Sequence, residues 1–187
     1  MDPSSTPDPA SGASSIFLIG MMGSGKSTVG RHLARACGLG FVDSDRELER
    51  RSGVTLATIF EVEGEEGFRS REARLLAELV QRPRIVLATG GGAVLLAETR
   101  LLLRQHGMVV YLDTPVDELA RRVAHETNRP LLQVADPQAR LQQLLEQREP
   151  LYREAAHVVV RSGLANPGKM VRWLVGHPAL ATLLGKP

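Results

Sequence analysis

Residues 15–27 read SIFLIGMMGSGKS, a short apolar run followed by the pattern GxxxxGK[ST]. The glycines of this pattern can adopt backbone conformations that residues with a Cβ avoid, so that successive N–H groups turn inward around phosphate oxygens. Lys26 adds a full positive charge for the β and γ phosphates, and the Ser27 hydroxyl is suited to bind Mg²⁺. The stretch therefore predicts a strand, a phosphate-binding loop and a bound nucleoside triphosphate.

The residues after the loop have the pattern of a helix. Val29, Leu33 and Cys37 recur at spacings of four, which places them on one helix face. The positive N-terminal end of that helix would point at the same phosphates. Cys37 is the single cysteine, so no intramolecular disulfide can form. Its place on the apolar stripe favours a buried small side chain over a nucleophile. A single cysteine without a disulfide suits a reducing, cytoplasmic location.

The composition favours one globular domain. The chain has 187 residues, of which 43% are hydrophobic and 24% are charged, as in ordinary globular proteins. Its 23 basic and 21 acidic residues are interspersed, so no basic face for nucleic acid is expected. No apolar run approaches the roughly 18 residues of a membrane span, so no membrane partner is expected either. We predict a disordered tail at 1–14, a single domain at 15–178 and a C-terminal tail at 179–187.

Apolar strand candidates alternate with helical patterns, which is typical of a parallel sheet covered by helices on both faces. We predict strands at 16–20, 41–43, 85–88, 108–112 and 157–160. The helical stripes between them read as core: Leu75, Leu76, Leu79 and Val80, then Val116, Leu119, Ala120 and Val123, then Met170, Val171, Leu174 and Val175. Ligands of such sheets bind beyond the carboxyl ends of the strands, so the residues after each strand are the site candidates.

Two carboxylates, Asp43 and Asp45, follow the second predicted strand. In an extended segment residues i and i+2 point the same way, so both could face the phosphate-binding loop. Asp43 could then approach Mg²⁺ or a substrate hydroxyl, and Asp45 could accept hydrogen bonds from a polyol. The alternative is helix capping, because the unpaired N–H groups at a helix start favour Asp. The position directly after a strand favours the site.

The third predicted strand runs into Thr89-Gly90-Gly91-Gly92. Consecutive glycines lose much backbone entropy on folding, so something should need the exposed backbone. Their N–H groups could approach a bound ring or carboxylate closely. A flexible turn between strand and helix explains the same stretch equally well from these residues alone.

Four arginines are candidate anion ligands: Arg69, Arg122, Arg129 and Arg148. A single arginine is more often a solvated or ion-paired surface group. A phosphoryl-transfer site nevertheless needs several, because they stay ionised and bind oxygens bidentately. Arg129 precedes Pro130 in a polar segment, which predicts a lid at about 123–137 that closes on ATP and excludes water.

The segments GMMGSGKSTVGRHLA, FVDSDRELE, GEEGFRSRE, TGGGAV, NRPLL and REPLYREAA follow one another in this order. Together they resemble the shikimate kinase family over about residues 15–176. The resemblance implies a three-layer α/β/α P-loop kinase fold with five parallel strands in the order 2-3-1-4-5, a substrate-binding helical region and a lid. It further implies ATP-dependent phosphorylation of the shikimate 3-hydroxyl, on the route to chorismate and the aromatic amino acids. Mg²⁺ would be the cofactor, and shikimate and ATP the small-molecule partners of a monomer.

On the ATP side, the resemblance assigns nucleotide binding to Gly23, Ser24, Gly25, Lys26, Ser27, Thr28, Arg122, Arg129, Asn166 and Pro167. Lys26, Asp43 and Arg129 would be catalytic, and Ser27 and Asp43 would lie at the Mg²⁺. Arg122 would stack near adenine. Family members often carry an arginine or similar polar residue before the Asn-Pro pair, where this chain has Ala165. Asn166, Pro167 and backbone groups could still enclose the base.

On the shikimate side, the resemblance implies that Arg69 and Arg148 grip the carboxylate and that Asp45 binds ring hydroxyls. Gly90, Gly91 and Gly92 would supply backbone contacts. A small acid with hydroxyl groups needs cations at one end and a carboxylate at the other, which these residues offer.

Other functions share parts of this pattern. A gluconate kinase or a nucleoside monophosphate kinase would have the same loop and fold but no need for Arg69 and Arg148 together with Asp45. A regulatory GTPase is disfavoured, since the chain has neither DxxG after a strand nor NKxD. A non-catalytic ATP-binding module is the non-enzyme alternative, against which the intact Lys26, Ser27 and Asp43 argue.

Overall fold

The computed structural model describes residues 15–124, 136–161 and 166–185. The tail predicted at 1–14, most of the predicted lid and Arg129 lie outside these ranges. The strands are β1 (Ile16–Ile19), β2 (Gly40–Asp43), β3 (Ile85–Ala88), β4 (Met108–Asp113) and β5 (Val158–Arg161). The helices are α1 (Lys26–Cys37), α2 (Ser44–Ser52), α3 (Leu56–Leu79), α4 (Ala97–His106), α5 (Val116–Val123), α6 (Pro137–Ala155), α7 (Pro167–Gly176) and α8 (Pro178–Leu183).

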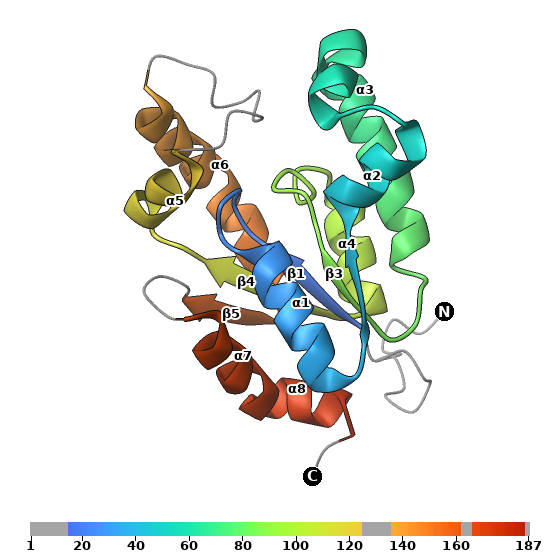
Figure 1. Ribbon diagram of the computed structural model, residues 1–187, viewed down its shortest axis with the longest axis vertical. Coiled ribbons are helices and arrows are strands. Elements are labelled where there is room, and N and C mark those ends of the chain that lie inside the picture. The colour runs from blue at the N-terminus through green and yellow to red at the C-terminus, as the bar shows by residue number, and fades with distance from the viewer. Residues whose placement is uncertain (1–14, 125–135, 162–165, 186–187) are drawn as a thin grey trace, which may run out of the picture.

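The strands form one parallel sheet in the order β2-β3-β1-β4-β5 (Figure 1). Each strand lies within one residue of its predicted bounds. The predicted strand order and the predicted parallel sheet are confirmed. Because β1 is central, its carboxyl end delivers the phosphate-binding loop to the middle of the sheet edge.

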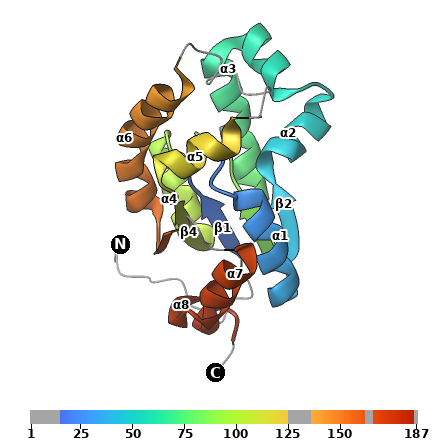
Figure 2. The same cartoon turned by 60° about the vertical axis from the view of Figure 1, so that its left-hand side comes forward.

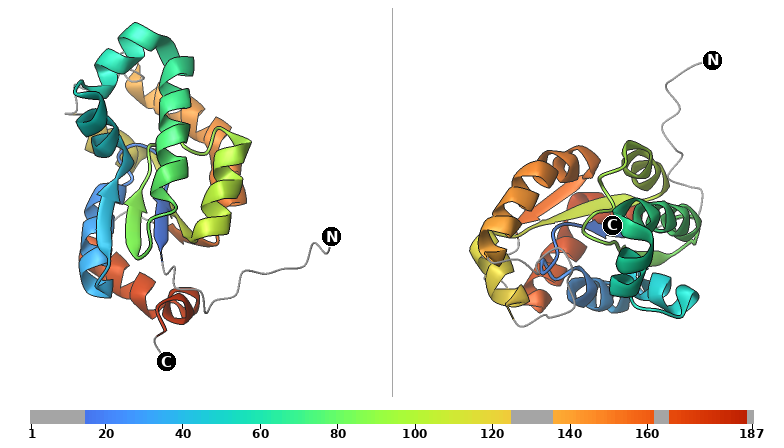
Figure 3. Two further views of the ribbon diagram at one scale, coloured as in Figure 1. Left: turned by 90° about the vertical axis from the view of Figure 1, so that its right-hand side faces the viewer. Right: turned by 90° about the horizontal axis from the view of Figure 1, so that it is seen from above.

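Both faces of the sheet are covered. Along β1, Phe17 and Ile19 join a core with α3, α4, α5 and α6, whereas Ile16 and Leu18 join a second core with α1, α7 and α8. All four side chains are fully buried, as expected of a central parallel strand whose alternate residues face opposite helix layers. The view from above in Figure 3 shows helices on either side of the sheet. The arrangement is the predicted three-layer α/β/α fold.

The helical stripes read from the sequence lie in these cores. The residues that are buried include Leu75, Leu76 and Leu79 of α3, Leu119 and Val123 of α5, and Met170, Val171 and Leu174 of α7. Cys37 is partly buried and packs against the second core, in line with its place on the α1 stripe. None of the helices in the ranges given above is long and apolar enough to cross a membrane.

The C-terminal tail predicted from residue 179 is wrong for residues 179–183. These residues belong to α8, where Leu180 is fully buried and Ala179 and Leu183 pack against the second core. The helix starts with Pro178, and the His177 side chain accepts a hydrogen bond from the N–H of Ala179 (3.3 Å). A proline at the first position favours the helix start, and the apolar face packs the segment against α7 and the second core.

The α2 and α3 helices extend beyond the carboxyl ends of the strands (Figure 3). Within α3, Gly64 adopts a non-helical conformation (φ 69°, ψ −176°), which divides the helix into two parts. The rings of Phe60 and Phe68 stack across this break, with centroids 4.2 Å apart. This helical region stands over the same sheet edge as the phosphate-binding loop.

Candidate active site

The glycines of the phosphate-binding loop adopt the backbone conformations that their residue type predicts. Gly20, Gly23 and Gly25 all have positive φ angles (143°, 76° and 92°). A Cβ on Gly20 would lie 2.8 Å from the carbonyl oxygen of Leu112, and one on Gly23 would lie 2.8 Å from Val123 Cγ1. The loop is therefore a close-packed backbone turn that accepts no side chain at these two positions.

Lys26 is held inside this loop. Its side chain is nearly buried, and its Nζ donates hydrogen bonds to the carbonyl oxygens of Gly20 and Met21, both at 2.8 Å. The α1 helix starts at Lys26, so the positive end of the helix dipole lies at the same loop as the ammonium. This end of the loop is built to attract an anion such as a phosphate group.

Asp43 serves the site and caps a helix at once. Its Oδ2 accepts a hydrogen bond from the Ser27 hydroxyl at 2.5 Å, and its Oδ1 accepts one from the N–H of Arg46 at 3.3 Å. The second bond makes Asp43 the N-cap of α2. The two explanations considered for this residue are therefore not exclusive, because each uses a different carboxylate oxygen.

The prediction that Asp43 and Asp45 face the same way rested on both lying in one extended segment, and this premise is wrong. The strand β2 ends at Asp43 and the helix α2 begins at Ser44, so Asp43 and Asp45 do not belong to one extended segment. The cap provided by Asp43 starts the helix one residue later, and Asp45 lies in its first turn. Both carboxylates nevertheless face the same cavity.

That cavity has a volume of about 310 Å³ and joins the phosphate-binding loop to the ends of β2 and β3. Its lining consists of Met22, Gly23, Gly25, Lys26, Ser27, Thr28, Asp43, Asp45, Thr89, Gly91 and Arg122. Two cations, two carboxylates and hydroxyl groups thus converge from segments that are far apart in the sequence. We call it the donor-acceptor cavity.

A neighbouring cavity of about 250 Å³ is lined by Ser24, Gly25, Thr28, Val29, Arg122, Pro167 and Met170. Arg122 lines both cavities and lies between them. Of the three residues predicted at the adenine, Arg122 and Pro167 line this second cavity. Asn166 is not part of the lining, and its side chain caps α7 by accepting a hydrogen bond from the N–H of Gly168 at 2.8 Å.

The guanidinium of Arg122 is fixed from two sides. Its Nε donates to Glu118 Oε1 at 2.7 Å, and its Nη1 donates to the carbonyl oxygen of Gly23 at 3.2 Å. Arg122 and Glu118 both belong to α5, which lies beside the start of α1 in Figure 2. Hydrogen bonds from Arg121 and Arg122 lower the pKa of the Glu118 carboxyl, which therefore remains ionised as their partner.

The three glycines after β3, here called the glycine loop (Gly90–Gly92), pack directly against charged side chains. The N–H of Gly90 donates to Ser44 Oγ at 2.9 Å. A Cβ on Gly90 would collide with the Glu72 carboxylate, and one on Gly92 would collide with the guanidinium of Arg69. Neighbouring groups leave no room for a side chain at these positions, so close approach rather than flexibility explains why glycines stand there. The approaching groups are side chains of the protein itself.

Glu72 was not singled out from the sequence. It is almost fully buried, and its Oε2 accepts a hydrogen bond from Arg69 Nη1 at 2.6 Å. Burial raises the pKa of the Glu72 carboxyl, and the positive charges of Arg69 and Arg148 oppose that shift. The signal for it was available, since Glu72 follows Arg69 by three residues and therefore lies beside it on one helix.

Arg69 and Arg148 meet around this carboxylate. Arg69 also reaches Glu65 at 3.2 Å and lies over the ring of Phe68. Arg148 is almost fully buried, and its Nη1 donates to the carbonyl oxygen of Gly91 at 3.4 Å. Neither arginine belongs to the lining of the donor-acceptor cavity, and both lie against the glycine loop, Arg69 at Gly92 and Arg148 at Gly91. Within the described ranges, Arg69 Nε and Glu72 Oε1 are buried polar atoms without a hydrogen-bond partner.

Comparison with known proteins gives a consistent result. A family model described as shikimate kinase matches residues 22–176. A shikimate kinase from Nitrosococcus oceani is 59% identical over 148 residues, which are 79% of this chain and 78% of that protein. One from Nitrosospira multiformis is 52% identical over 170 residues, 91% of this chain and 87% of that protein. The structure of a shikimate kinase from Acinetobacter baumannii in complex with shikimate is similar with a TM-score of 0.85 and 48% identity, and covers 87% of this chain and 91% of that one.

Proposed function

The chain belongs to the shikimate kinase family, and from this premise we propose that it transfers the γ-phosphoryl group of ATP to the 3-hydroxyl of shikimate. The products are shikimate 3-phosphate and ADP, on the route to chorismate and the aromatic amino acids. The observation that carries the chemistry is the hydrogen bond between Ser27 and Asp43. It joins the loop that would hold the phosphate donor to a carboxylate at the wall of the donor-acceptor cavity.

The two adjacent cavities suit the two ends of ATP. The cavity lined by Pro167 and Met170 would take the base, and the loop around Lys26 would take the phosphates. Lys26 would exchange its bonds to the loop carbonyls for bonds to phosphate oxygens. A phosphate oxygen carries negative charge that a carbonyl oxygen lacks, so the ammonium is attracted more strongly to it, which favours the exchange.

The residues present fit Mg²⁺ that arrives with ATP. Mg²⁺ prefers hard oxygen ligands, and it is usually bound by one or two carboxylates together with waters and phosphates. The Ser27 hydroxyl and the Asp43 carboxylate supply such oxygens side by side. In the part of the chain that the structure describes, no group of three or more His, Cys, Asp or Glu could hold a metal alone. When bound, the ion would offset negative charge on the phosphates.

For the acceptor, we propose that the shikimate carboxylate binds Arg69 and Arg148 and that the ring hydroxyls bind Asp45. Glu72 is the buried carboxylate beside the two guanidinium groups, and Glu65, which also pairs with Arg69, is largely exposed, so a bound carboxylate would add a second buried negative charge beside the two cations. Asp45 lines the donor-acceptor cavity on the side of α2. The acceptor would thus reach from Asp45 at the donor-acceptor cavity to the two arginines beside the glycine loop.

Transfer would proceed in line, with the 3-hydroxyl attacking the γ-phosphorus. Lys26 and Arg129 would offset the charge that develops on the transferring group. If the transition state is loose, little proton removal is needed early. We propose that Asp43, which lines the donor-acceptor cavity, orients the hydroxyl and takes up its proton late in the transfer.

The test is ADP release measured in parallel with shikimate, gluconate, AMP and no acceptor. We expect turnover with shikimate alone. Activity only with AMP would identify a nucleoside monophosphate kinase, and activity only with gluconate would identify a sugar-acid kinase. No activity with any acceptor, together with ATP binding, would favour a non-catalytic module.

We also propose that the enzyme acts as a monomer in the cytoplasm. The residues assigned to both substrates come from one chain, and ATP and the thiol of Cys37 suit a reducing compartment. Light scattering of the purified protein would test the monomer, and fractionation of cells that produce it would test the compartment.

A further inference from the structure

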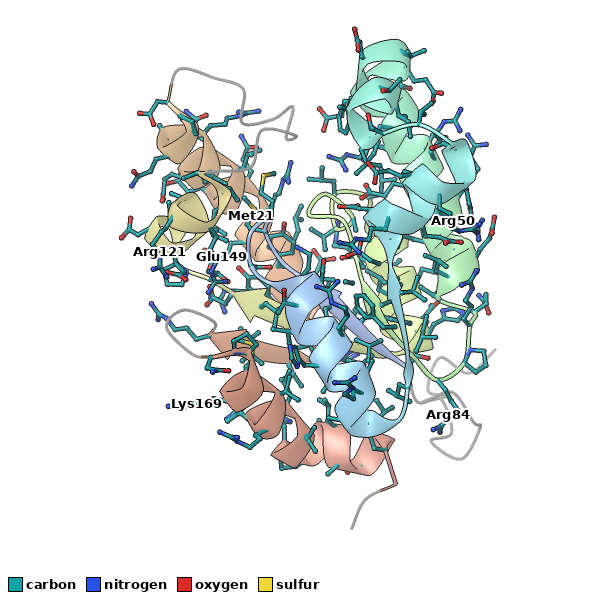
Figure 4. All side chains as sticks on the ribbon, in the orientation of Figure 1. Met21, Arg50, Arg84, Arg121, Glu149 and Lys169 are labelled. Carbon is teal, nitrogen blue, oxygen red and sulfur yellow. The ribbon has the colours of Figure 1, made fainter. Side chains whose placement is uncertain are left out.

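Tyr152 lies where the two substrate-binding loops meet. It sits near the end of α6 and is fully buried. Its hydroxyl donates a hydrogen bond to the carbonyl oxygen of Gly91 at 2.5 Å and lies 3.5 Å from Met21 Sδ. Figure 4 labels Met21 in the interior beside the phosphate-binding loop, whereas the labelled Arg50 and Lys169 point outward. One phenol group thus contacts both the glycine loop and the phosphate-binding loop.

The carbonyl group of Gly91 is fixed by donors from a single helix face. Arg148 and Tyr152 are four residues apart on α6, so both side chains project to the same side. The Tyr152 bond is the short one, since Arg148 donates from 3.4 Å. A trans peptide is planar, with its C=O and N–H groups pointing in opposite directions. By holding the Gly91 carbonyl toward α6, Tyr152 directs the N–H of Gly92 away from α6.

The glycine loop in turn packs against the phosphate-binding loop. A Cβ on Gly91 would lie 3.3 Å from the backbone nitrogen of Met22, tighter than an ordinary contact. The carbonyl oxygen of the adjacent Met21 accepts a hydrogen bond from Lys26. A shift of Gly91 would therefore change the wall of the donor-acceptor cavity that faces Lys26.

The phenol ring is itself rigidly placed. It stacks on Tyr111 with ring centroids 5.0 Å apart and an angle of 19°. Tyr111 belongs to β4, where it lies opposite Ile19 at the end of β1. Burial raises the pKa of the Tyr152 hydroxyl, which keeps it a protonated donor at physiological pH. The position of the hydroxyl is thus set by packing against the sheet and not by a mobile surface group.

We propose that Tyr152 is a positioning residue for the acceptor substrate. Its hydroxyl fixes the peptide between Gly91 and Gly92, and thereby the backbone surface that shikimate meets. It acts through the glycine loop without touching the substrate. The inference rests on the proposed function, because it assumes that this loop contacts shikimate.

The test compares Tyr152→Phe with Tyr111→Phe. Both variants keep the stacked rings and lose one hydroxyl, but only the first loses the bond to Gly91. For Tyr152→Phe we expect the KM of shikimate, and its Kd without ATP by calorimetry, to rise about five- to thirtyfold. The KM of ATP should change by less than about twofold, as should every constant of Tyr111→Phe.

The outcomes separate this inference from the proposed function. A wild-type protein that releases no ADP with shikimate would refute the function itself. An active wild type with an unchanged shikimate KM in Tyr152→Phe would overturn only the role of Tyr152. The role of Tyr152 would also be overturned if the affinities of Tyr152→Phe for shikimate and ATP fell in parallel and its melting temperature were lowered.

A second measurement covers a variant that loses turnover altogether. Amide hydrogen exchange at Gly91 and Gly92 reports the loop directly in the protein without substrates. We expect faster exchange in Tyr152→Phe and wild-type rates in Tyr111→Phe. Equal rates in the two variants would contradict the proposal.

Discussion

The Ser27 hydroxyl donates a 2.5 Å hydrogen bond to Asp43, and this bond joins the start of α1 to the end of β2. The two residues are 16 positions apart, and each is directly preceded or followed by a helix start. Because β1 and β2 are separated by β3 in the sheet, only the crossover geometry of the fold brings them together. The bond marks the point at which donor and acceptor would meet.

Lys26→Ala should reduce kcat by about 10²- to 10³-fold, because the variant lacks the charge proposed to stabilise the transferring phosphoryl group. Steady-state kinetics with shikimate would measure this. Thermal denaturation of the same variant is the control, since Lys26 also ties the carbonyls of Gly20 and Met21. A kcat within about threefold of wild type would contradict the assigned role.

Asp43→Asn and Asp43→Ala should separate the two tasks of this carboxylate. Asn still accepts a hydrogen bond and remains a good N-cap, so Asp43→Asn should keep the stability of the protein while kcat falls and the Mg²⁺ requirement rises. Asp43→Ala should in addition lower the free energy of unfolding by about 1 kcal/mol. Urea denaturation and Mg²⁺ titrations of turnover would test both. Full activity of Asp43→Asn would show that capping is its only task.

Arg148→Ala should mainly weaken shikimate binding. The variant loses a cation proposed to bind the substrate carboxylate, which corresponds to a rise of about 10- to 100-fold in the KM of shikimate. The KM of ATP serves as the internal reference. An unchanged shikimate KM would show that the assignment of Arg148 is wrong.

Glu72→Gln should destabilise the free protein, because Arg69 and Arg148 would lose the buried carboxylate beside them, and only the largely exposed Glu65 would still pair with Arg69. Breaking a buried ion pair in this way costs about 3 to 5 kcal/mol. Shikimate should restore part of this loss, since its carboxylate would replace the missing charge. Melting temperatures with and without shikimate would measure the difference, and an equal shift by shikimate in wild type and Glu72→Gln would argue against it.

The stability of the protein should fall as the pH drops below about 6.5, in part through His157. Its Nδ1 accepts a hydrogen bond from the N–H of Val109 at 3.0 Å, which requires an unprotonated nitrogen. Partial desolvation and the charge of Arg104 lower the pKa of His157 below its ordinary value of 6.5. The folded state therefore resists protonation more than the unfolded chain, and its advantage is lost as the pH falls through the lowered pKa.

Urea midpoints at about pH 7.5 and about pH 5.5 would test this, with His157→Gln as the comparison. The variant should be less stable than wild type at the higher pH, and the gap should narrow at the lower pH. A constant gap would assign the acid sensitivity to other groups.

Local patterns determined much of the candidate site. The loop around Gly20 and Gly25 needs positive φ angles that only its glycines accept readily. The position of Lys26 in the GxxxxGK[ST] pattern predicts that its charge is directed at the phosphates. The two readings of Asp43 could both be stated from the sequence, since capping and metal binding depend on residue type and on position after a strand. What could not be read was that the two are compatible, because this needs the positions of two separate oxygens.

Glu72 and Tyr152 show why the other residues of the site could not be predicted from the sequence. Glu72 looks like one more charged residue on a helix, and its burial follows only from the packing of α3 against the glycine loop. Tyr152 was visible inside REPLY, but its partner Gly91 is 61 residues away. The glycines at 90 and 92 had two equal explanations until the side chains beside them were placed.

The sequence by itself determined the parallel sheet, its strand bounds and the chemistry of the phosphate-binding loop, because apolar periodicity and glycine conformation are local properties of the chain. Only the tertiary structure decided that residues 179–183 form α8 and that Arg69 and Arg148 surround Glu72. It alone decided that Tyr152 fixes the carbonyl of Gly91. Burial, charge compensation and hydrogen bonding between distant segments depend on which helices pack together, and no local pattern specifies that.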